Sequence, residues 1–149
     1  SEVLPVIPTE YLIVRGEELR EVRDPIEWFW TQLGKANLLL GQIAFDKYEQ
    51  RNKALKNQGV PPQGRSEVWP HLKEAARMWT LALAYDRRYG ESFRDLKAGL
   101  RRIYNSLDGL NTEAMGVFCE SAAQTIQDYR LPPDLQLMRH FLVERFGCR

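Results

Sequence analysis

Two histidines in this chain each have a carboxylate about one helical turn away, an arrangement that both metal sites and acid–base pairs use. His71 follows Glu67 by four residues and precedes Glu74 by three, and His140 precedes Glu144 by four. Carboxylate-bridged metal sites in helical bundles use two Glu-x-x-His pairs with further glutamates, a pattern absent from this sequence. The spacing therefore predicts ordinary pairing on helix surfaces, with no metal and no cofactor.

Arg65 and His71 are separated by five residues at the predicted start of a helix. This spacing resembles the RxxxxH-type motif of the HEPN ribonucleases, which are all-α proteins whose Arg and His residues face a dimer mate and cleave RNA without metal. The resemblance covers these two residues, with Ser66 as the polar residue after the Arg and Pro70 inside the motif. It implies a catalytic role for Arg65 and His71. No glycine-rich phosphate loop and no GxSxG motif is present.

The stretch from Tyr85 to Asn105 gathers six basic side chains among aromatic residues, although the whole chain has a formal net charge of only +1. Like charges one turn apart disfavour a helix by about 0.2–0.5 kcal/mol per pair, whereas phosphate contacts reverse that sign by releasing counterions. The planar fork of arginine suits phosphate oxygens. The candidate nucleic-acid-binding residues are Arg87, Arg88, Arg94, Lys97, Arg101 and Arg102.

Three interpretations of this basic cluster stay open. Nearby Asp86, Glu91 and Asp95 could neutralise it as a solvated face, a nucleic-acid backbone could bind it, or an acidic protein could dock on it. Residues 1–27 hold seven acidic and three basic groups, a charge of −4, and residues 28–109 hold fourteen basic and eight acidic groups, a charge of +6. Such a dipolar chain suits docking to an oppositely charged partner, and the acidic first segment could itself be that partner, either in the same chain or in a second, self-associating copy. The second basic segment, residues 47–59, ends a predicted helix, where positive charge complements the helix dipole.

Cys119 and Cys148 are the only cysteines, and neither belongs to a CxxC pair. The sequence therefore predicts no disulfide framework and a reducing, cytoplasmic compartment. The best candidate for a membrane span, Leu38 to Phe45, is too short and contains Gln42.

Local signals divide the chain into an extended N-terminal arm, residues 1–24, and one helical domain, residues 25–149. In the arm, Pro5 and Pro8 exclude a helix, and Tyr11 to Val14 could form one short strand. Helix starts are predicted at Asp24–Pro25, Ser66, Ser92, Asn111 or Thr112, and Pro132–Pro133. The first helix is expected to end near Asn57, the second near Tyr89, the third at Gly109, the fourth before Pro132 and the fifth at Gly147. The predicted fold class is all-α, with about five helices in an antiparallel bundle.

The middle of the first helix is apolar on most sides, because Leu38, Leu39 and Ile43 add to a stripe that already includes Leu40. We therefore expect other helices to surround this section. Gly41 should let one of them approach closely, and Trp79 is expected in the core.

A helical bundle with one basic face, an acidic apolar arm and many aromatic residues is similar in profile to the small helical subunits of CRISPR effector complexes. The resemblance implies a non-catalytic subunit that stacks in a larger complex and contacts backbone phosphates through the basic cluster. The alternative is a protein-protein adaptor or assembly factor whose basic face docks an acidic partner. Both interpretations predict that the chain binds other protein subunits and does not bind a membrane.

Overall fold

The computed structural model describes residues 25–89, 93–132 and 136–148, and it confirms the all-α prediction. The described residues contain helices and turns and no strand. The arm of residues 1–24, with its predicted strand and the Asp24 cap, lies outside them. The helices are α2 (Pro25–Asn57), α3 (Trp69–Tyr89), α4 (Phe93–Asp108), α5 (Thr112–Asp128) and α6 (Gln136–Arg139), and α6 continues as a π-helical segment (His140–Arg145).

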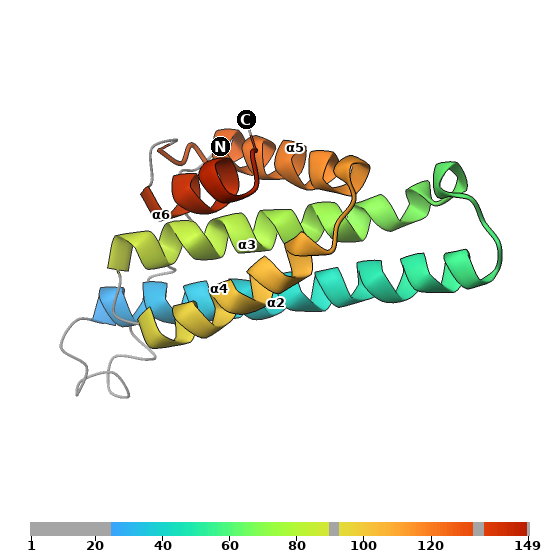
Figure 1. The fold of residues 1–149 in the computed structure, drawn as a ribbon. Helices are drawn as coiled ribbons and strands as arrows, with labels where there is room; N and C mark the ends of the chain where they lie inside the picture. The colour runs from blue at the N-terminus through green and yellow to red at the C-terminus, as the bar shows by residue number, and fades with distance from the viewer. Residues whose placement is uncertain (1–24, 90–92, 133–135, 149) are drawn as a thin grey trace.

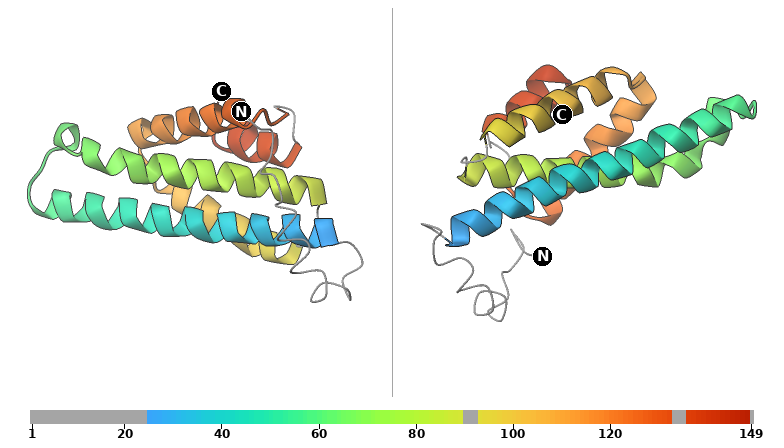
Figure 2. Two further views of the ribbon diagram at one scale, coloured as in Figure 1. Left: turned by 180° about the vertical axis from the view of Figure 1, so that it is seen from behind. Right: turned by 90° about the horizontal axis from the view of Figure 1, so that it is seen from below.

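Helix α3 is the central element of the fold. Helices α2 and α3 form a long antiparallel hairpin, α5 and α6 pack on α3, and α4 lies beside α2 (Figure 1). Figure 2 shows the same arrangement from behind and from below, with α2 at the outside of the molecule. Every residue from Met78 to Ala84 is buried, so two turns of α3 are covered on all sides. The largest buried side chain is Trp79, which stacks on Phe45 of α2 and contacts Phe118 of α5.

Gly41 of α2 allows a close contact between α2 and α3, as the sequence predicts. A Cβ atom at this position would overlap the indole ring of Trp79. Nε1 of Trp79 also donates a hydrogen bond to the carbonyl oxygen of Leu38 at 3.2 Å. An intact indole therefore needs a glycine opposite it.

The capping residues predicted from the sequence are confirmed at the start of α5 and wrong at the start of α3. Asn111 caps α5, because its side-chain oxygen accepts a hydrogen bond from the amide of Ala114 at 2.8 Å. Ser66 does not cap α3 and instead begins a 3₁₀ turn, Ser66–Val68. The α-helix starts at Trp69, which places Pro70 in the first turn, where a missing amide proton costs nothing.

The prediction of no disulfide is wrong, because Cys119 and Cys148 are bonded to each other. Their Cα atoms are 5.1 Å apart although 29 residues separate them in sequence. The turn after α5 and the positive φ of Gly147 return the chain end to the side of α5. Spacing along the sequence could not reveal this pairing. The bridge also removes the basis for a reducing compartment, since disulfides persist mainly in oxidising ones.

The C-terminal segment is held to α4 by aromatic side chains. Tyr104 of α4 contacts Phe141 and Phe146, with ring centroids 4.6 and 5.6 Å away. The guanidinium of Arg145 lies over the rings of Tyr104 and Phe146 and also pairs with Asp108 at 3.5 Å. The segment is thus joined to α5 by a covalent bond and to α4 by ring packing.

Candidate interaction surfaces on α2 and α4

The predicted basic cluster lies at the end of α3 and along α4, and the structure describes two of its six side chains. Arg101 and Arg102 are exposed, and no ion pair links either of them to another described side chain. The side chains of Arg87, Arg88, Arg94 and Lys97 lie outside the described residues.

Arg101 and Arg102 do not share one face of α4. Successive residues of an α-helix point about 100° apart, so they project in different directions. Arg102 lines a groove between α4 and α2, together with Gly99 and Ile103. Arg101 does not line this groove, and its side chain is exposed on the outer side of α4. Of the two described arginines, the structure thus places Arg102 at the groove and Arg101 outside it.

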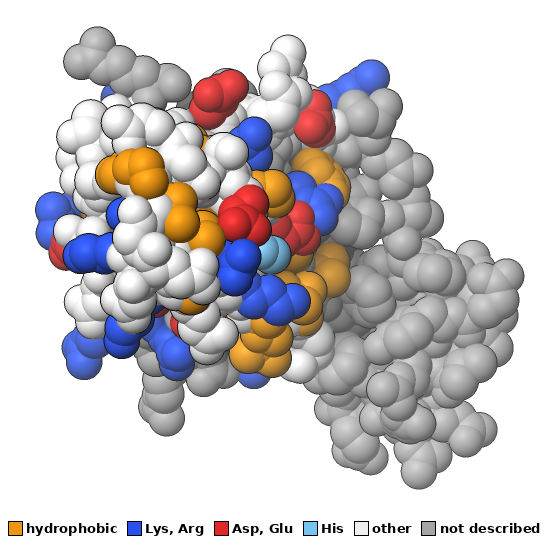
Figure 3. Space-filling model, turned by 90° about the vertical axis from the view of Figure 1, so that its right-hand side faces the viewer, with side chains coloured by type: hydrophobic (Ala, Val, Ile, Leu, Met, Phe, Trp, Pro, Cys, Tyr) orange, Lys and Arg blue, Asp and Glu red, His pale blue; other side chains and the backbone are white. Residues whose placement is uncertain are grey.

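The second basic segment, residues 47–59, forms a mixed surface. At the end of the α2–α3 hairpin, Lys and Arg side chains are interspersed with acidic and hydrophobic ones (Figure 3). Arg51 pairs with Glu67 at 3.3 Å. Lys53 and Lys56 line a polar hollow of about 440 Å³ that also contains Glu49. Partial burial, and then the charge of Asp46, raises the pKa of the Glu49 carboxyl. These carboxylates weaken any attraction of the segment for a polyanion.

The candidate acid–base and metal residues form surface contacts. His140 lies 3.3 Å from Glu144, as its spacing predicts. The carboxylates beside His71 pair with arginines instead, Glu67 with Arg51 and Glu74 with Arg77 at 2.8 Å. In the described ranges, no group of three His, Cys, Asp or Glu side chains is placed to hold a metal ion.

Arg65, the first residue of the ribonuclease-like pair, has a structural contact. Its Nε donates to the carbonyl oxygen of Val60 at 2.7 Å and closes the loop between α2 and α3. The loop reverses the chain direction after Pro61 and Pro62. The hydrogen bond therefore gives Arg65 a structural role that requires no catalytic function. A catalytic role of Arg65 and His71 stays a prediction.

The middle of α2 contradicts the expectation that other helices surround it. Leu39, Leu40 and Ile43 are 63%, 49% and 44% exposed, the largest values among the exposed large hydrophobic residues. On the opposite side, Ala44, Phe45 and Tyr48 are buried against the core. Helix α2 thus presents an outer apolar face, formed by Leu39, Leu40 and Ile43.

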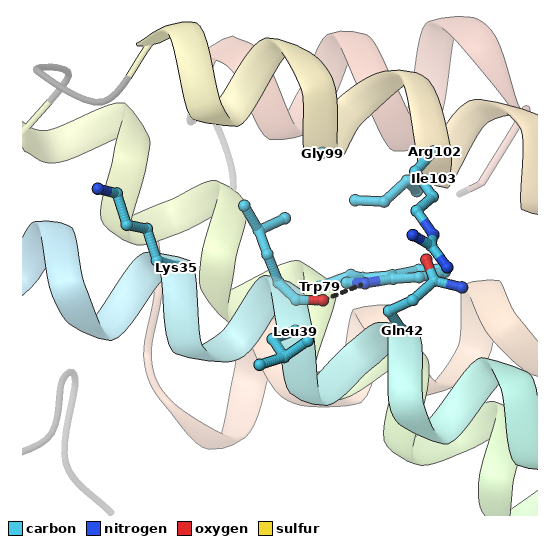
Figure 4. Close-up of a pocket in the computed structure, with 8 residues that line it drawn as sticks. Lys35, Leu39, Gln42, Trp79, Gly99, Arg102 and Ile103 are labelled. Carbon is cyan, nitrogen blue, oxygen red and sulfur yellow. Dashed lines mark hydrogen bonds between the residues drawn. The ribbon is translucent and has the colours of Figure 1, made fainter.

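A groove of about 310 Å³ runs beside this outer apolar face, between α2 and α4. Leu38 and Leu39 form one wall, Ile103 and the backbone of Gly99 form the other, and Trp79 lies at the base. Gln42 and Arg102 extend toward each other from the two helices (Figure 4). The amide of Gln42 donates to Asp46 at 2.9 Å. The groove is apolar inside and carries an arginine at its rim.

Gly99 allows α4 to approach Leu38 of α2 closely beside this groove. A Cβ atom there would lie 3.0 Å from Cδ1 of Leu38, closer than ordinary contact. The sequence predicts that other helices surround Leu39 and Ile43, and it contains no local signal for the close approach at Gly99. The available signal was the composition of α2, since an all-round apolar section is either buried or left for a partner.

Comparison with protein-family models, with curated proteins and with solved structures finds no match to this chain. No described helix is both long enough and apolar enough to cross a membrane.

Proposed function

We propose that this chain is a non-catalytic helical subunit of a larger assembly, which binds another protein through the outer apolar face of α2. The observation that supports this is the exposure of Leu39, Leu40 and Ile43 on one side of one helix. Adjacent large hydrophobic side chains on a surface mark interaction sites more often than scattered ones do. The same helix buries Ala44, Phe45 and Tyr48 in the core, so the outer apolar face is distinct from its core-facing side.

A double variant tests the protein-binding role. Leu40→Glu with Ile43→Glu places two charges on the outer apolar face without touching the core. We expect the natural chain to retain a defined partner, identified by mass spectrometry and then reconstituted from purified components. The double variant should lose at least tenfold in affinity. Lys47→Glu, one turn further along α2, is the matched control and should keep the partner. Equal retention by the double variant would refute the role of this face.

The second candidate is binding of a nucleic-acid backbone by the outer side of α4, as in the small subunits of CRISPR effector complexes. Its support is Arg101, which is exposed and forms no ion pair within the described part of the chain. Contacts of this kind position a strand without reading its sequence.

Salt dependence tests this candidate. Binding of a fluorescent single-stranded oligonucleotide should weaken steeply with salt, and removing one phosphate contact should lower the slope of log K against log[salt] by roughly 1. Arg101→Glu is the test variant. Lys53→Glu changes the charge equally on the mixed surface and should have the smaller effect. No binding at low salt, or equal effects of both variants, would exclude this face as the nucleic-acid site.

A further inference from the structure

The groove between α2 and α4 has the chemistry of a receptor for an apolar segment with acidic neighbours. Its volume of about 310 Å³ is at the small end of the range for ligand pockets, roughly 300–1,000 Å³. Leu38, Leu39, Trp79 and Ile103 give it apolar walls, and Arg102 gives its rim a positive charge. A few side chains of an extended peptide would fill it.

One segment of the same chain has the matching chemistry. Residues 1–24 carry six acidic and three basic groups, a charge of −3, and contain the apolar run Tyr11 to Val14. Glu10 directly precedes this run, and Glu17 and Glu18 follow it closely. These residues lie outside the described structure, and the segment joins α2 at Pro25.

The connection to α2 brings this segment within reach of the groove. Val14 precedes Pro25, the first residue of α2, by eleven residues, which span up to about 36 Å when extended. Leu39 lies fourteen residues into α2, roughly 21 Å from its start. The segment can therefore turn back along α2 and reach the groove. A short tether also gives it an effective concentration of order millimolar, which no separate chain easily matches.

We propose that Tyr11 to Val14 occupy the α2–α4 groove of their own chain, with the neighbouring glutamates near Arg102. The groove and the outer apolar face of α2 meet at Leu39, so this segment would form one border of the surface that binds the partner. Leu40 and Ile43 would stay outside its reach. The inference does not depend on the proposed assembly function.

Photocrosslinking in the full chain tests this placement. Tyr11 is replaced by p-benzoyl-phenylalanine, and adducts are mapped by peptide mass spectrometry. We expect adducts on residues 38–42 and 99–103, in a band of monomer size. The same probe at the exposed Gln63, at the far end of the α2–α3 hairpin, is the control for nonspecific capture. Adducts elsewhere, a yield no higher than the control, or a band of dimer size would overturn the proposal.

A matched pair of charge variants sharpens the test. Arg102→Glu should lower the crosslink yield at least threefold, because it places a negative charge at the groove rim. Arg101→Glu makes the same change one residue away, outside the groove, and should leave the yield unchanged. Equal losses of crosslink yield in the two variants would show that Arg102 at the groove rim does not hold the segment. Circular dichroism confirms that both variants fold, and Leu40→Glu with Ile43→Glu should still crosslink even if the assembly function fails.

Discussion

Helices α2 and α3 both contain sections that are apolar on most sides, yet the molecule uses them differently. From Met78 to Ala84 every residue of α3 is buried, whereas α2 buries Ala44, Phe45 and Tyr48 and exposes Leu39, Leu40 and Ile43. Helix α3 is covered by α2, α5 and α6, while α2 has α3 on one side and α4 beside it. A hydrophobic section therefore shows that a helix has partners to bind, and the topology decides whether those partners lie within the chain.

Removal of the Trp79 indole from the buried section of α3 should cause the largest loss in the free energy of unfolding. Trp79→Ala deletes the largest fully buried side chain and its hydrogen bond to Leu38. We expect the free energy of unfolding to fall by about 3–5 kcal/mol, measured by urea denaturation. Leu40→Ala, an apolar truncation on the outer apolar face of α2, should change it far less. Similar losses at both sites would show that α2 is covered in solution.

Opening the disulfide should weaken the cover that α5 and the C-terminal segment provide for α3. Cys119→Ser with Cys148→Ser should lower the free energy of unfolding by about 2–4 kcal/mol, because the unfolded chain gains freedom. Urea denaturation without reductant measures the loss. The natural chain with dithiothreitol should match the double variant, and a variant as stable as the oxidised chain would refute a stabilising bridge.

The contact between α2 and α3 can be tested from the α2 side. Gly41→Ala adds a methyl group that overlaps the Trp79 ring, so the helices must separate or the indole must move. Overpacking of this kind costs about 1–3 kcal/mol. The same substitution at Gly116, where a Cβ atom meets open space in α5, should stabilise the fold slightly. The measurement is the change in the free energy of unfolding, which should be a loss for Gly41→Ala and a gain for Gly116→Ala.

Removal of a buried polar group from α3 should raise the free energy of unfolding, in contrast to the losses expected above. Thr80 is fully buried, and its hydroxyl has no hydrogen-bond partner among the described residues. Thr80→Val removes this unsatisfied group at nearly constant shape, so the free energy of unfolding should rise by about 1 kcal/mol. A loss instead would show that a bound water or a shifted rotamer satisfies the hydroxyl.

The outer apolar face of α2 should tolerate polar residues best. Leu40→Gln with Ile43→Gln should change the free energy of unfolding by no more than about 0.5 kcal/mol, because neither side chain is buried in the fold. Thermal unfolding measures this effect. A loss above 2 kcal/mol would place these side chains in an internal contact and remove the comparison with α3.

The fold class followed from the sequence alone, as did the ends of α2 and α3 and, within one residue, the end of α4. Proline, glycine and the Asn111 cap act on the backbone within a few residues, so the ends of α2 and α4 and the start of α5 followed from local rules. The small size of Gly41 predicted a close approach for the same reason, and the structure supplied the partner in Trp79. Ser66 failed as a cap because the loop bond from Arg65 and the 3₁₀ turn already set the chain direction there.

The packing of the helices established three further features: α3 is central, Cys119 meets Cys148, and Arg102 lines the groove beside α2 while Arg101 does not. These outcomes depend on how helices far apart in sequence are placed around each other. Hydrophobic burial favours every arrangement that removes apolar area from water, and it does not specify which faces meet. That choice is made by the fit of particular side chains across the interfaces, above all the Trp79 indole against Gly41.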